Sequence, residues 1–126
     1  MKPMLYLYRS CTSCRNAASV LDAHGVDYDV REYFKEPFTR EELESVLERA
    51  GQQPSDLVAT RSVPYRTQRL AEQGLPDDEL LERMLAEPRL VRRPILITED
   101  EVLVGFDRGR YEQKAKALAA RMPADA

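Results

Sequence analysis

The sequence predicts an α/β fold with a mixed four-stranded sheet and a helical insertion between the second and third strands. Three observations predict it. A strand–helix–strand pattern covers residues 4–31, a mostly helical stretch covers about 39–90, and apolar runs at 95–97 and 102–104 precede a last helical pattern. At 126 residues, the chain suits a single domain over 1–126 that can bury a core.

The first strand and helix follow from a change in hydrophobic period. Residues 4–8 are continuously apolar and rich in aromatic side chains, as in a strand buried on both faces. Residues 12–24 carry apolar side chains three and four positions apart, at Ala17, Val20 and Leu21. Gly25 then supplies a helix stop. This segment therefore predicts a strand, a turn near Ser10 and a helix.

Residues 26–31 alternate apolar and charged side chains, which predicts a second strand with one face buried. The apolar members of that pattern are Val26, Tyr28 and Val30. Strand–helix–strand units almost always form right-handed crossovers between parallel strands, so we expect the first two strands to be parallel. Glu36-Pro37 ends the unit.

The insertion begins at a capping box, in which Thr39 accepts from a helical N–H and Glu42 reaches back to the cap. Gly51 ends this helix, and Pro54 favours a short helical turn after it. Pro76 and the acidic residues that follow predict a further helix, which Pro88 stops. The buried faces are expected at Leu43, Val46, Leu47, Ala50, Leu80, Leu81, Met84 and Leu85.

The last third predicts a hairpin and a helix. Residues 92–97 lead into a strand, 98–101 form a turn, and 102–105 return. A helix that ends at Pro123 should then pack on the sheet through Tyr111, Ala115, Leu118, Ala119 and Met122. We expect the tail at 124–126 to be mobile.

The chemistry is expected at Cys11 and Cys14, which lie two residues apart between the first strand and its helix. At the helix start, free backbone N–H groups and the helix dipole stabilise a Cys11 thiolate. Arg15, four residues on, lies near the same face and adds a fixed positive charge. The spacing therefore predicts a redox-active CxxC, in which Cys11 attacks and Cys14 resolves through a disulfide.

Two other interpretations of the cysteine pair remain open at this point. A closed zinc site needs four ligands, usually cysteine and histidine, but the sequence holds two cysteines and one histidine, His24. We therefore predict no metal site. Inert, buried cysteines are the second alternative, although Arg9 and Arg15 flank the pair and do not suit an apolar environment.

Composition limits the classes of function. The net charge of −3 argues against direct nucleic-acid binding. The chain shows no leader-like start and no apolar stretch long enough to span a membrane, so we expect a cytoplasmic protein. Cytoplasmic thiols are kept reduced, and a close cysteine pair there is more often catalytic or sensing than structural.

Four short motifs together resemble the ArsC/Spx family of arsenate-reductase-like proteins: Cys-Thr-Ser-Cys-Arg, Thr-Arg-Ser, Arg-Arg-Pro-Ile and Val-Gly-Phe. The resemblance implies a thioredoxin-like fold, related to that of glutaredoxin. It also implies a cis bond between Arg93 and Pro94, facing the nucleophile. Arg15 and Arg93 match basic positions of the family, whereas Arg61 matches its Spx-like and glutaredoxin-like branches.

The resemblance implies a thiol reductase, with Arg61, Arg93 and Pro94 binding a small thiol or oxyanion substrate. No cofactor is expected to be bound, and glutathione or thioredoxin/glutaredoxin would donate electrons. The alternative is a redox-sensing regulator that binds the RNA polymerase α subunit, because Spx regulators also carry a cysteine at the position of Cys14. In either case we expect a monomer.

Overall fold

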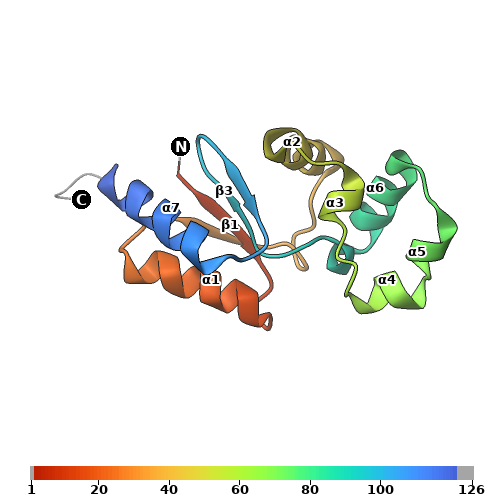
Figure 1. Cartoon of the computed structure of the whole chain (residues 1–126), viewed down its shortest axis with the longest axis horizontal. Coiled ribbons are helices and arrows are strands. Elements are labelled where there is room, and N and C mark those ends of the chain that lie inside the picture. The colour runs from red at the N-terminus through yellow and green to blue at the C-terminus, as the bar shows by residue number, and fades with distance from the viewer. Residues whose placement is uncertain (1, 122–126) are drawn as a thin grey trace.

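The computed structural model describes residues 2–121, which form a mixed four-stranded sheet with helices around it (Figure 1). The strand order is β2-β1-β3-β4. Strand β1 is parallel to β2 and antiparallel to β3, and β3 is antiparallel to β4. The bounds are Met4–Leu7 for β1, Asp29–Glu32 for β2, Ile95–Ile97 for β3 and Val102–Val104 for β4. The predicted α/β class, mixed sheet and hairpin are confirmed.

Helices α1 (Thr12–Ala23) and α7 (Arg108–Ala120) lie side by side on one face of the sheet (Figure 1). Successive side chains of a strand point to opposite faces, so alternate strand residues meet these helices. These strand residues form one buried cluster with Cys14 of α1 and Tyr111 of α7. The strand residues of the cluster are Leu5, Leu7, Leu96 and Leu103. The predicted packing of the last helix on the sheet is therefore confirmed.

The opposite face of the sheet packs against the insertion. Tyr6, Ile95 and Val102 belong to a second buried cluster, which also contains Leu43 and Val46 of helix α2 (Arg40–Ala50). Helices thus cover both faces of the central strands. This explains why residues 4–7 are continuously apolar rather than alternating, whereas Tyr8, which follows the strand, is exposed.

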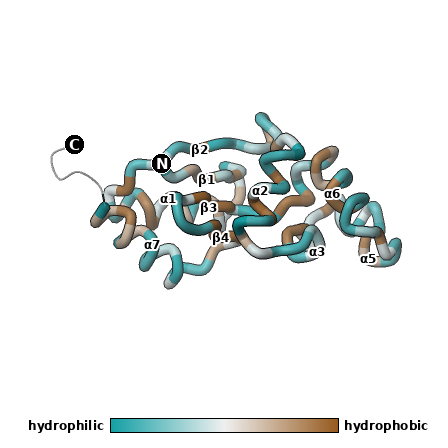
Figure 2. Tube along the Cα trace, turned by 90° about the horizontal axis from the view of Figure 1, so that it is seen from above, coloured by the Kyte–Doolittle hydropathy of each residue, from teal (hydrophilic) through white to brown (hydrophobic). Residues whose placement is uncertain are grey.

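The second strand differs from its prediction. We expected a strand from Val26 with one buried face, but β2 begins at Asp29 and Val30 is 38% exposed. Val26 is buried in the link between α1 and β2. As an edge strand, β2 pairs only with β1, and Figure 2 shows it at the margin of the molecule and largely hydrophilic. An edge position of this kind does not require a buried face.

The insertion is helical, as predicted, and most of it extends away from the sheet (Figure 1). Residues 63–73 form two short helices that were not predicted. After α2, the elements are α3 (Pro54–Leu57), α4 (Val63–Thr67), α5 (Leu70–Gln73), α6 (Asp77–Ala86) and the 3₁₀ turn η1 (Pro88–Leu90).

The predicted boundaries of α2 are confirmed in atomic detail. The Glu42 N–H donates to Thr39 Oγ1 at 3.2 Å, and the Thr39 N–H donates to Glu42 Oε1 at 2.8 Å. Gly51 ends the helix at φ 65°, a left-handed conformation that glycine adopts without steric cost.

Backbone pairing joins the insertion to the segment that enters β3. Val58 forms an antiparallel bridge with Val91, the Ala59 N–H donates to the Leu90 carbonyl at 2.6 Å, and the Arg92 N–H donates to the Leu57 carbonyl at 3.0 Å. The loop after α3 is therefore held beside residues 90–92, close to the start of β3.

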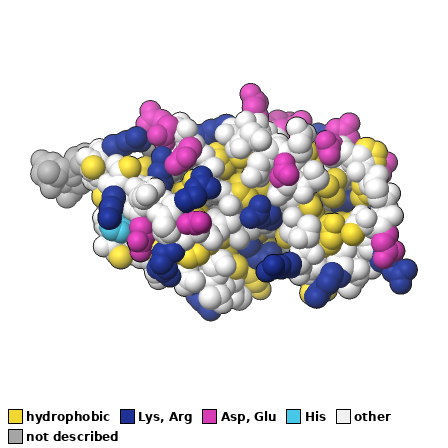
Figure 3. Space-filling model, in the orientation of Figure 1, with side chains coloured by type: hydrophobic (Ala, Val, Ile, Leu, Met, Phe, Trp, Pro, Cys, Tyr) yellow, Lys and Arg dark blue, Asp and Glu magenta, His cyan; other side chains and the backbone are white. Residues whose placement is uncertain are grey.

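Within residues 2–121, no helix is both long and apolar enough to cross a membrane. Acidic and basic side chains are interspersed on the face shown in Figure 3, without a large field of one sign. The predicted roles of Met122 and Pro123 and the expected mobility of 124–126 lie outside the described residues.

We predict that Thr39→Ala lowers the free energy of unfolding by about 1 kcal/mol, because it removes the acceptor from the α2 capping box. Urea unfolding followed by circular dichroism measures this. Thr39→Ser is the matched control and should retain most of the stability, since its hydroxyl can accept the same hydrogen bond. Equal destabilisation by both variants would contradict the role given to the cap.

Candidate active site

The sheet brings the loop after β1 next to the segment before β3. Tyr6 lies opposite Ile95 in their antiparallel register, so the chain leaves β1 and enters β3 at the same end of the sheet. The loop closes where the Cys11 N–H donates to the Tyr8 carbonyl at 2.9 Å. Cys11 is the N-cap residue of α1, as predicted.

Several groups hold the pKa of Cys11 below the ordinary value of a thiol. Burial alone raises this pKa, but the nearby backbone N–H of Cys14, the Cys14 thiol and the Arg93 guanidinium together lower it by more. Each of them stabilises the thiolate, either as a donor or as a positive charge. Cys11 is only partly buried and lines a cleft, so a substrate can reach its sulfur.

Cys14 has the opposite character. Its side chain is fully buried in the cluster beneath α1 and α7, and burial raises its pKa to about 12. The neighbouring Cys11 raises this pKa further, whereas the Tyr8 N–H, which donates to Cys14 Sγ at 3.5 Å, and the charge of Arg93 act in the other direction. The pair thus consists of an accessible acidic thiol and a buried thiol that keeps its proton.

Arg93 supplies the positive charge beside both cysteines. Its guanidinium carbon lies 5.6 Å from the centre of the Phe34 ring, and its Nη1 donates to the Arg89 carbonyl at 3.5 Å. The buried Nε has no hydrogen-bond partner within residues 2–121. Arg93 therefore interacts with the cysteine pair and with the Phe34 ring at the same time.

Arg15 makes a contact that its helical spacing did not predict. Its Nη1 donates to the Arg9 carbonyl at 3.4 Å, and the residue is not among those that line the cleft. The arginine among the main influences on the pKa of Cys11 is Arg93, which lies on the segment that enters the neighbouring strand β3. Helical spacing places Arg15 near Cys11 along the chain, but its side chain turns toward the preceding loop.

The Arg93–Pro94 peptide bond is cis, as the resemblance implied. Pro94 is buried, and its carbonyl accepts from the Gly105 N–H at 2.8 Å. This hydrogen bond ties the residue after the cis bond to the chain that follows β4.

A cleft of about 680 Å³ opens beside Cys11. Its walls come from three separate parts of the chain: the start of α1, the loop after α3, and the segments that flank the hairpin. The lining residues include three arginines, namely Arg61, Arg92 and Arg93. Two of these were predicted as substrate-binding residues, and the structure places both in one cleft with the predicted nucleophile.

Arg61 is exposed and lies on the short loop that precedes α4. Ser62 fixes this loop: its hydroxyl donates to the Ala59 carbonyl at 2.7 Å and accepts from the Tyr65 N–H at 3.3 Å. Since Ala59 is itself paired with Leu90, the loop that carries Arg61 is anchored to the segment that carries Arg93.

Arg92 was not predicted as a site residue, but it lines the same cleft. Its Nη1 donates to the Asp56 carbonyl at 3.3 Å. This hydrogen bond connects the segment before the hairpin to the insertion. Its Nη2 lies 2.9 Å from the place where a Cβ of residue 105 would be. Only glycine suits residue 105, because it also has φ 79° and any larger residue would displace Arg92.

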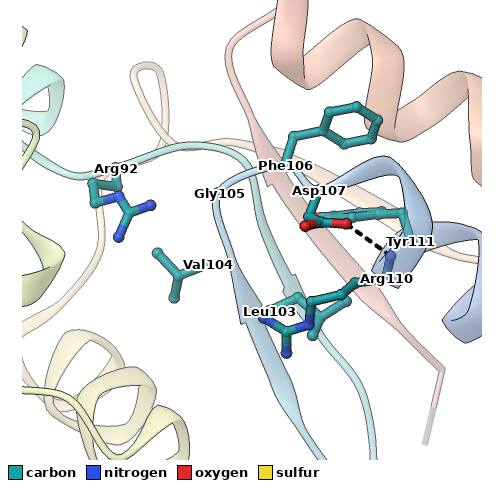
Figure 4. Close-up of a pocket in the computed structure, with 8 residues that line it drawn as sticks. All are labelled: Arg92, Leu103, Val104, Gly105, Phe106, Asp107, Arg110 and Tyr111. Carbon is teal, nitrogen blue, oxygen red and sulfur yellow. Dashed lines mark hydrogen bonds between the residues drawn. The ribbon is translucent and has the colours of Figure 1, made fainter.

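A smaller pocket of about 150 Å³ adjoins the cleft and shares Arg92, Gly105 and Phe106 with it. Figure 4 shows Arg92 on one side of this pocket and Asp107, Arg110 and Tyr111 on the other. The Asp107 carboxylate accepts from the Arg110 N–H at 3.0 Å and thereby caps α7. Within the described residues, no group of three or more His, Cys, Asp or Glu side chains is placed to hold a metal ion.

The fold and the site together define a class of thiol proteins. Its members have a thioredoxin-like α/β fold, an acidic thiol at the start of the first helix and a cis-proline segment facing that thiol. Within that class, the model of the ArsC family matches residues 6–114. The chain belongs to the ArsC family.

Curated relatives and solved structures agree with this assignment. The chain is 34% identical to the regulatory protein MgsR of Bacillus subtilis over 111 residues, which is 88% of each chain. It is 37% identical to the global transcriptional regulator Spx of Enterococcus faecalis over 103 residues, 82% of this chain and 78% of that protein. The structure of an ArsC family related protein from Bacteroides fragilis has a TM-score of 0.81 at 27% identity and covers 90% of this chain and 98% of that one.

We predict that Arg93→Gln raises the pKa of Cys11 and slows its alkylation near neutral pH several-fold, because it removes the positive charge from the thiolate. The rate of iodoacetamide modification against pH measures this. Arg15→Gln is the matched control and should change the profile little, since Arg15 turns toward Arg9. A larger effect from Arg15→Gln than from Arg93→Gln would show that the helix-borne charge controls Cys11 after all.

Proposed function

We propose that the protein is a thiol-dependent oxidoreductase in which Cys11 is the nucleophile and Cys14 the resolving thiol. The observation that carries the proposal is the contrast between two neighbouring sulfurs. Cys11 is accessible and acidic, whereas Cys14 is buried and protonated, and each affects the pKa of the other. This contrast assigns an order to the two steps of a dithiol reaction.

In the first step, the Cys11 thiolate attacks one sulfur of a mixed disulfide. A Cys11–substrate disulfide forms, and the other half leaves as a thiolate. In the second step, Cys14 attacks Cys11 Sγ, its proton passes to the departing substrate thiolate, and the Cys11–Cys14 disulfide remains. The substrate gains two electrons, and the cysteine pair loses them.

The first step also prepares the second. Among the influences that raise the pKa of Cys14 are its hydrogen bond to Cys11 and the negative charge there. Once Cys11 is part of a disulfide, that charge has gone, so Cys14 loses its proton more readily. Glutathione or thioredoxin/glutaredoxin would then reduce the internal disulfide, and a reducing compartment such as the cytoplasm suits this cycle.

The cleft favours an anionic substrate, because Arg61, Arg92 and Arg93 line it around Cys11. Guanidinium groups bind carboxylates and tetrahedral oxyanions through paired hydrogen bonds. Arsenate would undergo the equivalent reaction. Cys11 would displace water from arsenic, and attack by Cys14 on Cys11 Sγ would then leave the electron pair on arsenic as arsenite.

A second candidate function has its own supporting observation. Two relatives that share 34% and 37% identity with the chain are the regulators MgsR and Spx. In this alternative the same disulfide reports oxidation, and the protein binds the RNA polymerase α subunit rather than turning over a substrate. Either function can be carried out by a monomer.

One comparison separates the two functions. The purified protein is supplied with arsenate or a glutathione mixed disulfide. Thioredoxin with thioredoxin reductase, or glutathione/glutaredoxin with glutathione reductase, supplies electrons from NADPH, and NADPH consumption above that of a reaction without the protein is followed. In parallel, reduced and oxidised protein are tested for binding to the RNA polymerase α subunit. Multiple turnovers support the reductase, whereas absence of turnover together with redox-dependent binding overturns it in favour of the regulator.

We predict that Cys14→Ser still forms a mixed disulfide at Cys11 with oxidised glutathione but cannot form the internal disulfide. Mass spectrometry should show one glutathione adduct on the variant treated with oxidised glutathione. Wild-type protein treated with peroxide should instead lose two hydrogens and carry no adduct. Cys11→Ser is the matched control and should show neither product. If Cys11→Ser retains the reactive thiol and Cys14→Ser loses it, the two roles are reversed.

A further inference from the structure

An aromatic cluster borders the cysteine pair without lining the cleft. Tyr33 and Phe34 follow β2, and Tyr8 follows β1. The Tyr8 and Phe34 rings stack with centres 4.3 Å apart, and Tyr33 meets Phe34 edge-to-face at 4.9 Å. The main cleft includes none of these three side chains among its lining residues.

The cluster is in contact with Arg93. The guanidinium carbon lies 5.6 Å from the centre of the Phe34 ring, a distance at which a cation is attracted to an aromatic face. The Tyr33 hydroxyl donates to the Val91 carbonyl at 3.0 Å and is close enough to the Arg93 guanidinium for the two groups to influence each other. The cluster therefore touches both the side chain of Arg93 and the backbone that leads to it.

Polar groups also contact Arg93. Its guanidinium interacts with the Tyr33 hydroxyl and the Cys11 thiol. Its Nη1 contact with the Arg89 carbonyl is 3.5 Å long, at the limit of a hydrogen bond, and its Nε has no partner within the described chain. No salt bridge with a carboxylate is seen for it among the described residues. The aromatic face of Phe34 is therefore a further constraint on this long, rotatable side chain, beside its polar contacts.

We propose that Phe34 is a positioning residue, whose ring holds the Arg93 guanidinium beside Cys11. Tyr8 and Tyr33 pack against Phe34 and keep its ring in place. Phe34 touches neither sulfur in this account and acts only through Arg93. The groups that then face Cys11 are the Cys14 thiol and N–H, the Arg93 guanidinium and, across the cleft, the exposed Arg61 and Arg92.

The test is the pH profile of Cys11 alkylation in Phe34→Leu, which keeps an apolar side chain but removes the aromatic face. The midpoint should move to higher pH, and the rate near neutral pH should fall several-fold. Phe34→Tyr, which retains a ring, should restore the wild-type profile. In an Arg93→Gln background, Phe34→Leu should add no further shift, because the cation that it positions is gone.

Phe38→Leu is the control for general loosening of the core. Phe38 stacks on Tyr6 with ring centres 4.7 Å apart and also meets Tyr33 at 5.3 Å, but the cation over its ring is Arg31. It should lower the unfolding midpoint in urea without moving the alkylation profile. The proposal is overturned if Phe34→Leu leaves the profile unchanged, if it shifts the profile equally in the Arg93→Gln background, or if Phe38→Leu shifts it as far.

Discussion

Antiparallel pairing of β1 with β3 is the constraint on which the site depends. It places Tyr6 opposite Ile95, so that the loop after β1 and the segment before β3 meet at one end of the sheet. Cys11 and Arg93 lie on these two segments, far apart in the sequence. The bridge between Val58 and Val91 then brings the insertion to the same place. The cleft forms where these three segments meet.

The two cysteines acquire different chemistry from environments only one helical turn apart. Cys11 stands at the N-cap, beside Arg93 and open to the cleft, whereas Cys14 points into the core under α1 and α7. Burial favours the neutral thiol, and a nearby cation with backbone donors favours the thiolate. A thiol pair of this kind has one group ready to attack and a second that reacts only after the first has changed. A redox sensor could use the same property, and the cleft lined by Arg61, Arg92 and Arg93 beside Cys11 adds the support for a reductase.

Local features of this fold were predictable because nearby residues encode them. The Thr39–Glu42 capping box and the N-cap position of Cys11 follow from spacing alone, and both are present. One prediction was wrong: the start of β2 was misplaced, because the pattern along the sequence does not reveal that a strand lies at the edge of the sheet. The proximity of Arg93 to Cys11 could not be predicted from spacing, because the pairing of β1 with β3 brings these two residues together. The contact of Phe34 with Arg93 could hardly be predicted from the sequence. The only indication of it is the pair of aromatic residues that follows the second strand.

The central claim is that the two thiols differ in acidity and that Cys11 is the acidic one. Carbon-13 labelling of the cysteine Cβ atoms, followed by NMR titration of the reduced protein, measures both sites separately. The account predicts that the Cys11 signal titrates below the ordinary thiol range, while the Cys14 signal moves only near pH 12. Two signals that titrate together at the ordinary value, or a Cys14 signal that titrates first, would contradict it.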